Sequence, residues 1–475
     1  MTKTMHAHLI GICGTAMASL AGMLKERGYV VTGSDAAAYP PMSDFLATLG
    51  IPIAQPFSER NLDPLPDFVV VGNAISRGNV ELEAALDLHL PLRSLPQVLH
   101  DEFLAGHERL VVAGTHGKTT TSSLLAWLFS AGQRAASFLI GGIPENFGSS
   151  FHLGAGPEFI LEGDEYDSAF FDKGPKFLHY FPDALILTSV EFDHADIYRN
   201  LDEVKTAFKR LVNLVPRRGV LIAWDGHPNV DECVARALCR VERYGFGEQS
   251  TWRISEVEYR PERTCWSVLR GGQLWGRFEF PLAGEYNVLN ATAAAVMASH
   301  YGISVEAIAE GLRTFRSVKR RLEVRSELYG ITIVDDFAHH PTAIAQTLNA
   351  LRTRYAGRRL WAVLEPRSNT LRRSVFQKQL AGSLAVADQV IVAGIFKSEA
   401  IPDCERLDPE AVVSDLQQAG TPARLLQTAD EIVDVIAPEL EPGDVVAILS
   451  NGGFGGIYKK LPARLAQFHE VSARA

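Results

Sequence analysis

The segment LVVAGTHGKTTTSSLLAWLF combines an apolar strand, a glycine-containing turn and a helical stretch. Gly114 and Gly117 allow backbone N–H groups to close around phosphate oxygens, and the positive end of the helix dipole favours an anion there. Lys118 can neutralise β- and γ-phosphate charge, and Thr119 can offer its hydroxyl to Mg²⁺. The usual spacing, GxxxxGKS or GxxxxGKT, would require glycine in place of Val112, so this is a shortened variant. The segment therefore predicts a nucleotide site; the alternative is a tight turn with a solvated lysine.

Two acidic segments, FILEGDEYD and ILTSVEFDHAD, follow at the ends of further apolar strands. Mg²⁺ prefers oxygen ligands and commonly bridges the phosphates of a bound nucleotide, and carboxylates beside a phosphate loop supply such ligands. Either segment alone could equally be an acidic cap on a loop. Together with the phosphate loop, they indicate that a nucleotide is hydrolysed or that its phosphoryl group is transferred. The candidate side chains are Glu162, Asp164, Glu165, Asp167, Glu191, Asp193, His194 and Asp196.

These segments belong to a chain in which short apolar strands alternate with amphipathic helical stretches, which is typical of an α/β fold. Ten apolar runs are predicted to be buried parallel strands, and ligands of such folds collect at the carboxyl ends of the strands. Residues 243–285 alternate in polarity and carry turn signals, so we expect antiparallel strands there, attached to the middle domain. The ten runs are HLIGI, FVVVG, LVVAG, FILEG, ALILTSV, GVLIAW, ITIVDDF, LWAVLE, QVIVAG and VVAILSNGG.

Length and composition argue against several classes of protein. A chain of 475 residues is too long for one typical core, so two or three domains are expected. The apolar runs are shorter than the roughly 18 residues that span a bilayer, and the first residues lack the pattern of an export signal. Five scattered cysteines give neither a disulfide framework nor paired metal knuckles, and a net charge of -10 argues against nucleic acid as the main partner. We therefore expect a cytoplasmic protein that acts on small molecules, without nucleic acid or membrane partners. A monomer or weak homodimer is expected, although the sequence does not determine the oligomeric state.

Six motifs resemble, in their order along the chain, the Mur ligase family of ATP-dependent amide ligases of peptidoglycan precursor synthesis. They are GTHGKTTT, EGDEYD, EFDHAD, GEYNVLNATAA, RRLE and DDFAHHPT, and the resemblance covers nearly the whole chain. It implies an α/β fold with three domains. These are a Rossmann-like UDP-sugar-binding domain over residues 1–106, a P-loop-type ATP-binding central domain over 107–317, and a Rossmann-like peptide-binding C-terminal domain over 318–475.

Further segments, EYDSAFFDKGPKF, LEPRSNT and SNGGFGGI, are similar to the family members that act in peptidoglycan recycling. Those members join UDP-N-acetylmuramate to the murein tripeptide L-alanyl-γ-D-glutamyl-meso-diaminopimelate. The resemblance implies ATP as phosphoryl donor, Mg²⁺ as the metal, and an acyl phosphate that the alanyl amine attacks. The alternative within the family is the ligase that adds L-alanine to the same nucleotide sugar. Alternatives outside it are an ATP-binding regulatory protein that forms no amide, and a dehydrogenase, which leaves the phosphate loop unexplained.

The resemblance also implies roles for individual residues around the nucleotide. Asn287 is expected to contact adenine, while Arg321 and Asp336 reach the γ-phosphate and the ribose when the domains close. The residues expected at the ATP phosphates are Gly114, Thr115, His116, Gly117, Lys118, Thr119 and Thr120. The expected Mg²⁺ ligands are Thr119, Glu162 and His194. The residues expected to be catalytic are Lys118, His194 and Arg321.

The expected UDP-sugar and peptide sites lie outside the central domain. The turn in HLIGICGTAMA lacks the full GxGxxG spacing, so it is a weak signal without the resemblance. Arg367 suits a carboxylate because its guanidinium fork is bidentate, and the alternative is a surface salt bridge. The residues expected at the UDP-sugar are Gly11, Gly14, Thr15, Asp35 and Asn73. The residues expected at the peptide are Arg367, Ser368, Asn369, Thr370 and Asn451.

Three positions depart from the family's pattern, and the first, Gly163 where alanine is expected, should be harmless. Ser189 stands where relatives often have asparagine, and Tyr286 stands where histidine is common, which still allows stacking on adenine. Several relatives carry a carbamylated lysine near a second metal, and Lys209 lies in the corresponding region. Members with the lactyl substrate generally lack this feature, so we do not place Lys209 in the site. His194 or His339 is expected to assist the attacking amine.

Overall fold

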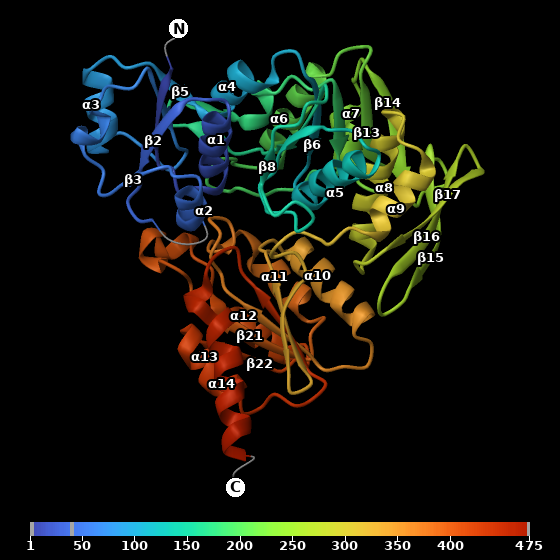
Figure 1. Ribbon diagram of the computed structural model, residues 1–475. Coiled ribbons are helices and arrows are strands. Elements are labelled where there is room, and N and C mark those ends of the chain that lie inside the picture. The colour runs from blue at the N-terminus through green and yellow to red at the C-terminus, as the bar shows by residue number, and fades with distance from the viewer. Residues whose placement is uncertain (1–3, 39–41, 473–475) are drawn as a thin grey trace.

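The computed structural model describes residues 4–38 and 42–472, whose helices and strands form three bodies, each built around its own large sheet (Figure 1). The N-terminal body, blue in Figure 1, lies beside the central body, teal to yellow, and the C-terminal body, orange to red, lies below both. The predicted α/β fold is confirmed. No helix in the described ranges is long and apolar enough to cross a membrane.

The N-terminal body is a five-stranded parallel sheet in the order β3-β2-β1-β4-β5. The strand order reverses at β1, because β2 and β4 pair with it on opposite sides. Such a switch point opens a crevice at the carboxyl ends of the strands. The strands are β1 (His6–Ile10), β2 (Val30–Ser34), β3 (Ile53–Ala54), β4 (Phe68–Val71) and β5 (Leu92–Ser94). The helices are α1 (Thr15–Glu26), α2 (Met42–Thr48), α3 (Val80–Asp87) and α4 (Leu95–Leu99).

The central body is built on a ten-stranded sheet in the order β17-β16-β15-β14-β13-β12-β6-β9-β7-β8. Its middle strands are mostly buried apolar runs. Helices α5 and α8 cover one face of the sheet, and their apolar side chains share one core with these strands. The helices are α5 (Lys118–Ala131), α6 (Leu201–Leu214), α7 (Pro228–Val234), α8 (Glu285–His300) and α9 (Val305–Arg313). The inner strands are β6 (Glu108–Ala113), β7 (Ser137–Leu139), β8 (Phe151–His152), β9 (Glu158–Gly163), β12 (Ala184–Leu187) and β13 (Val220–Trp224). A separate two-stranded sheet contains β10 (Asp167–Ala169) and β11 (Asp172–Pro175).

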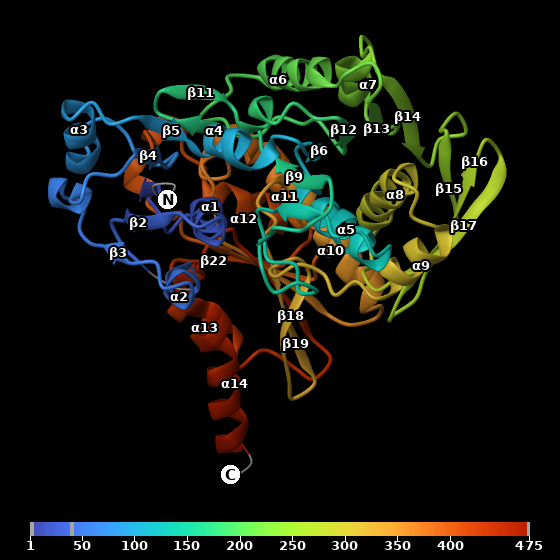
Figure 2. The same ribbon diagram turned by 45° about the horizontal axis from the view of Figure 1, so that its top comes forward.

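The segment predicted to hold antiparallel strands continues this central sheet. β14 (Arg240–Gly245) pairs in parallel with β13, and the first residues of β15 (Trp252–Tyr259) pair in parallel with β14. Antiparallel pairing begins only with β16 (Thr264–Arg270) and β17 (Gln273–Phe280). Figure 2 shows β15, β16 and β17 side by side at one edge of the molecule. The prediction of antiparallel strands is therefore confirmed for β15–β17. It is wrong for the last residues of β14, which pair in parallel, because turn signals in the sequence do not reveal which strands pair with each other.

The C-terminal body is a six-stranded sheet in the order β18-β19-β23-β20-β21-β22, and only the β18–β19 pair is antiparallel. Its two faces are covered by separate cores. The strands are β18 (Glu323–Leu328), β19 (Ile331–Asp336), β20 (Leu360–Leu364), β21 (Gln389–Ala393), β22 (Ala423–Leu426) and β23 (Val445–Leu449). The helices are α10 (Pro341–Arg354), α11 (Gln377–Leu384), α12 (Pro409–Gln418), α13 (Ala429–Ile436) and α14 (Ile457–Ser472), which runs away from the other bodies in both views.

Candidate active site

Three segments of the central body meet at one edge of its sheet. β6 lies between β9 and β12, and all three strands are parallel. The loop of residues 114–117, here called the phosphate loop, follows β6 directly and leads into α5. The acidic segment after β9 therefore lies on one side of this loop, and the acidic segment after β12 lies on the other. The structure thus brings both clusters of carboxylates to the amino-terminal end of α5.

The two glycines of the phosphate loop have backbone conformations that other residues rarely adopt. Gly114 has a φ of 136° and Gly117 a φ of 79°. A Cβ on Gly114 would collide with the hydroxyl of Thr188, and one on Gly117 would collide with the side-chain amide of Asn290. The loop therefore packs tightly against its neighbours. Because glycine has no Cβ, the backbone of the loop can also approach a ligand closely.

Lys118 is the first residue of α5, and its side chain turns back over the loop. Its Nζ donates to the carbonyl of Gly114 at 2.7 Å and to Glu165 Oε2 at 2.8 Å. Burial would lower the pKa of this amine, but the charge of Glu165 outweighs burial and the pKa is raised. Lys118 is therefore a fixed positive charge at the loop. Its partner Glu165 is only 2% exposed. Glu165 was among the candidate carboxylates of the acidic segments but not among the three metal ligands that the resemblance implies.

Thr119 and Glu162 form a pair of oxygen donors beside this lysine. The Thr119 hydroxyl donates to Glu162 Oε1 at 2.8 Å, and the Gly141 N–H donates to Glu162 Oε2 at 2.7 Å. Burial raises the pKa of Glu162 despite the nearby charge of Lys118. A half-buried carboxylate and a hydroxyl at a phosphate loop match the hard oxygen ligands that Mg²⁺ prefers, and the cation would offset the cost of removing the carboxylate from water. These two residues fit the expected metal.

His194, the third expected metal ligand, meets Glu165 and not Glu162. Its Nε2 lies 3.1 Å from Glu165 Oε1, and its ring centroid is 3.9 Å from that of Tyr166. Burial would lower the pKa of His194, but its hydrogen bond with Glu165 outweighs burial and raises it. Glu165 thus joins Lys118 and His194 into one ionic chain, an arrangement that the sequence alone did not indicate.

Two asparagines of α8 have different hydrogen-bonding surroundings. Asn287, expected at adenine, is 2% exposed and donates to the carbonyl of Ala283 at 2.8 Å. Asn290 packs against Gly117, and its Nδ2 is buried without a hydrogen-bond partner among the described residues. A buried amide donor without a partner is costly, so this group is a candidate to bind a phosphate oxygen. The available signal was its spacing of three residues from Asn287, which places both on one helix face.

Substituting Gly117 with alanine is expected to weaken ATP binding by at least about tenfold, since a Cβ would push on Asn290 and every 1.4 kcal/mol is tenfold. Calorimetric titration with ATP and with ADP measures the change. The matched control is Gly148→Ala: Gly148 has a φ of 68°, but a Cβ at this position would meet no other atom within 4 Å. Equal loss of affinity in both variants would mean that contact at the phosphate loop is not the cause.

The residues expected from the third body lie in a loop network of their own. Asp336 accepts hydrogen bonds from the backbone of Leu322 at 2.8 Å and of Ala338 at 2.9 Å, so its carboxylate orders its own domain. The guanidinium of Arg321 lies 5.2 Å from the ring centroid of Phe337. Its neighbour Arg320 pairs with Asp335 at 3.2 Å. Two consecutive arginines therefore have different environments, and the ion pair with the buried Asp335 belongs to Arg320.

The LEPRSNT loop lies at the seam between the central and C-terminal bodies. Asn369 donates to Asp196 Oδ2 at 2.7 Å, and the Thr370 hydroxyl accepts from the backbone of Ala195 at 3.1 Å. Ser368 is buried and accepts from the N–H of Leu371 within its own turn. Three of the residues expected at the peptide thus make domain contacts or local turn contacts in this structure.

Arg367, from the same loop, lines a cavity of about 410 Å³ in the C-terminal body. Its guanidinium stacks 3.7 Å from the ring centroid of Phe396 and lies 3.3 Å from Glu365 Oε1. Lys397 also lines the cavity, which therefore presents two cations and one carboxylate. Nearby, Asn451 has a buried Oδ1 without a hydrogen-bond partner in the described part of the chain. A cavity with these groups suits a ligand that carries carboxylates and an ammonium.

The residues expected at the UDP-sugar lie at the carboxyl ends of three adjacent N-terminal strands. Gly11, with a φ of 82°, turns the chain after β1, and Gly14 precedes α1. Asp35 follows β2 and accepts a hydrogen bond from the N–H of Cys13 at 2.9 Å. Asn73 follows β4, and its side chain is exposed, as is that of Thr15. All five positions thus lie at the carboxyl edge of this sheet, around its switch point, where such sheets usually bind ligands.

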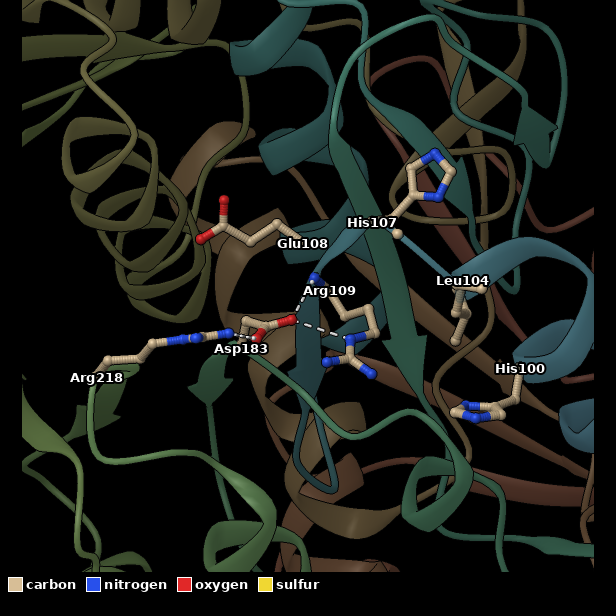
Figure 3. A pocket seen from close by; sticks show the side chains of 9 residues that line it. His100, Leu104, His107, Glu108, Arg109, Asp183 and Arg218 are labelled. Carbon is tan, nitrogen blue, oxygen red and sulfur yellow. Dashed lines mark hydrogen bonds and ion pairs between the residues drawn. The ribbon is translucent and has the colours of Figure 1, made fainter.

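A larger cavity, of about 600 Å³, lies at the other edge of the central sheet (Figure 3). Asp183 at its centre accepts hydrogen bonds from the backbone and the Nε of Arg109 and lies 3.6 Å from Arg218. These residues are at the amino ends of β6 and β12, whereas ligands of parallel sheets bind at the carboxyl ends. Because the cavity lies at the end of the sheet opposite the carboxyl ends, and its central carboxylate is already paired with two arginines, it is not the candidate site.

Comparison with known proteins identifies the family of this chain. The chain matches the Mur ligase family catalytic domain over residues 6–106, the Mur ligase middle domain over 112–298 and the Mur ligase glutamate ligase domain over 320–452. It is 42% identical, over 98% of this chain and 100% of the relative, to the UDP-N-acetylmuramate–L-alanyl-γ-D-glutamyl-meso-2,6-diaminoheptandioate ligase of Escherichia coli.

Two further relatives help to place the chain within this group. A UDP-N-acetylmuramate–L-alanine ligase of Desulfitobacterium hafniense is 30% identical over 96% of this chain and 98% of its own. The crystal structure of a murein peptide ligase from Psychrobacter arcticus is 35% identical, with a TM-score of 0.75 over 97% of this chain and 98% of that one. These findings confirm the resemblance predicted from the motifs. The chain belongs to the Mur ligase family.

Proposed function

We propose that this protein is an ATP-dependent amide ligase that joins UDP-N-acetylmuramate to the tripeptide L-alanyl-γ-D-glutamyl-meso-diaminopimelate in peptidoglycan recycling. The observation that carries the proposal is the pairing of two sites. A phosphate loop with a fixed lysine charge lies in one body, and a cavity with two cations and one carboxylate lies in the body packed against it. The higher identity to the tripeptide ligase than to the alanine ligase favours the larger amine substrate.

In the proposed reaction the lactyl carboxylate attacks the γ-phosphorus of ATP, which releases ADP and forms an acyl phosphate. Lys118 stabilises the charge that develops on the transferred phosphoryl group. Mg²⁺, held by Thr119 and Glu162, would supply further positive charge there. The alanyl amine then attacks the acyl carbon, phosphate leaves with the bridging oxygen, and the ammonium loses its proton as the amide forms.

His339 is the better candidate of the two histidines expected to accept that proton. Burial lowers the pKa of His339, so its imidazole is neutral at pH 7 and can accept a proton. The pKa of His194 is raised by its bond to Glu165, which favours the charged form. His339 also lies 3.9 Å from Asp193, whose carboxylate would stabilise the imidazolium.

The test compares amine substrates in the presence of ATP, Mg²⁺ and UDP-N-acetylmuramate. We expect phosphate release that depends on the tripeptide, with a product whose mass is that of the amide. Release that depends on L-alanine alone would assign the activity of the alanine-adding relative. Release that ignores both amines would show an ATPase or regulatory protein and would contradict the ligase assignment.

A further inference from the structure

A second cluster of potential metal ligands lies at the seam between the central and C-terminal bodies. It consists of His116 from the phosphate loop, Glu191 from the segment after β12, and His340 at the start of α10, and is called here the seam cluster. Ligand atoms of the three side chains lie within 4.8 Å of one another. Thr119 and Glu162, the two residues that fit the expected Mg²⁺, do not belong to the seam cluster.

The spacing of the seam cluster is close to that of a tetrahedral metal site. His116 Nε2 lies 3.4 Å from Glu191 Oε2, and His340 Nδ1 lies 3.8 Å from the same oxygen. Ligands bound to zinc at their usual distances are roughly 3.3 Å apart. All three ligand atoms already lie within 4.8 Å of one another, so they must move only somewhat closer to share one ion.

Glu191 and His340 are in the ionisation states that metal binding needs. Burial, reinforced by the neighbouring His116, lowers the pKa of His340 to about 4, so this imidazole is neutral at pH 7. Burial would raise the pKa of Glu191, but hydrogen bonds from His116 and His227 outweigh it and hold that pKa well below its usual range. A neutral imidazole and an ionised carboxylate are the forms that bind metal.

The groups around the cluster orient these ligands. His340 Nε2 lies 3.2 Å from the carbonyl oxygen of Phe192, so that nitrogen carries the proton and Nδ1 has the free electron pair. The Thr342 hydroxyl donates to Glu191 Oε2 at 2.7 Å. Metal-binding histidines usually donate their second N–H to a carbonyl, and metal-binding carboxylates are usually hydrogen-bonded as well. The free electron pair of His340 Nδ1 accepts a long hydrogen bond, 3.2 Å, from the Thr342 N–H, and a metal ion would replace this bond.

We propose that the seam cluster binds a divalent transition-metal ion, such as Zn²⁺, through His116, Glu191 and His340. Two imidazoles and one carboxylate suit Zn²⁺, Co²⁺ or Ni²⁺ and not Mg²⁺, which prefers oxygen alone. His227, whose Nε2 lies 3.6 Å from the other oxygen of Glu191, borders the same cluster. Because His340 belongs to the C-terminal body and the other two ligands to the central body, a bound ion would tie the phosphate loop to α10.

The test is calorimetric titration of the full, metal-stripped chain with Zn²⁺ in millimolar Mg²⁺, without nucleotide. We expect one site that is at least ~10-fold weaker in His340→Asn, since one ligand is lost. Asparagine retains the helix-capping role of His340, whose Nδ1 accepts from Thr342 N–H, so this variant separates binding from folding. The matched control is His339→Ala, which removes the adjacent histidine and should bind Zn²⁺ as the unmodified chain does.

Visible absorption of the Co²⁺ form gives a second readout that depends on the ligands themselves. Tetrahedral bands that vanish in both His340→Asn and Glu191→Gln would support the seam cluster. Unchanged Zn²⁺ affinity in His340→Asn would overturn the proposal. Loss of Zn²⁺ binding in Glu162→Gln together with retention in His340→Asn would also overturn it, because the ion would then occupy the oxygen pair of the phosphate loop.

Discussion

Replacing Lys118 with methionine should lower kcat for tripeptide-dependent ADP formation by about 10²–10³-fold, the usual effect of removing one preorganised group that stabilises transition-state charge. Methionine retains most of the length of the side chain and removes the charge. The amine has one defined position, between the Gly114 carbonyl and Glu165, at the amino-terminal end of α5. A solvated lysine in a tight turn would have no such fixed position, and its loss would hardly change kcat. The size of the change in kcat therefore distinguishes a nucleotide site from a tight turn with a solvated lysine.

The same substitution leaves Glu165 with one positive partner fewer. Breaking a buried ion pair costs about 3–5 kcal/mol, although His194 remains beside this carboxylate. Thermal unfolding must therefore accompany the kinetics, and kcat is compared only at temperatures where the variant is folded. Lys209→Met is the matched control, because Lys209 lies on α6 and pairs with Glu232 at 2.6 Å. A folded K118M enzyme with unchanged kcat would show that the loop does not hold the phosphates.

Replacing Arg367 with alanine should raise the KM for the tripeptide by about 30-fold or more, and leave the KM values for ATP and UDP-N-acetylmuramate nearly unchanged. Truncating one partner of a desolvated charge pair typically costs at least about 2 kcal/mol. Arg367 stacks on Phe396 and lines the C-terminal cavity, so its fork is held in place before a carboxylate arrives. Arg367→Lys should recover only part of this loss, because an ammonium cannot bind a carboxylate in the bidentate manner.

Steady-state kinetics with each substrate varied in turn measures this effect. The control is Arg373→Ala, since Arg373 lies on the same loop with a similar exposed fraction, 25% against 27%, but pairs with Glu405. The KM for the tripeptide should change less than about twofold in the control, as for a surface ion pair. Equal changes in both variants, or a change in the KM for ATP instead, would remove Arg367 from the peptide site.

Much of the fold could be predicted from local sequence. The ten buried runs all contain strands, because uninterrupted Val, Ile and Leu segments of this length are stable only between two covered faces. The carboxylate segments after β9 and β12 could be placed near the phosphate loop, since parallel strands end at one edge. The order of strands, which puts β6 between them, depends on contacts distant in sequence and was not predictable from local patterns.

The site was harder to predict wherever two segments meet. Glu165 could be recognised as acidic, but its role in joining Lys118 and His194 depends on the packing of two strand ends. Asn290 could not be singled out from the sequence, because its contact with Gly117 and the lack of a partner for its Nδ2 among the described residues both depend on packing. Asn369 and Thr370 were expected at the peptide and lie in the domain seam, because one loop serves both a cavity and an interface.

The most direct test of the central claim uses UDP-N-acetylmuramate labelled with ¹⁸O in both oxygens of the lactyl carboxylate, together with ATP, Mg²⁺ and the tripeptide. The account predicts that mass spectrometry finds one labelled oxygen in each released phosphate and the other in the new amide. This transfer occurs only if the carboxylate attacks the γ-phosphorus and the amine then displaces phosphate. Unlabelled phosphate, or labelled phosphate without the amide, would contradict the assignment of this protein as a ligase of these two substrates.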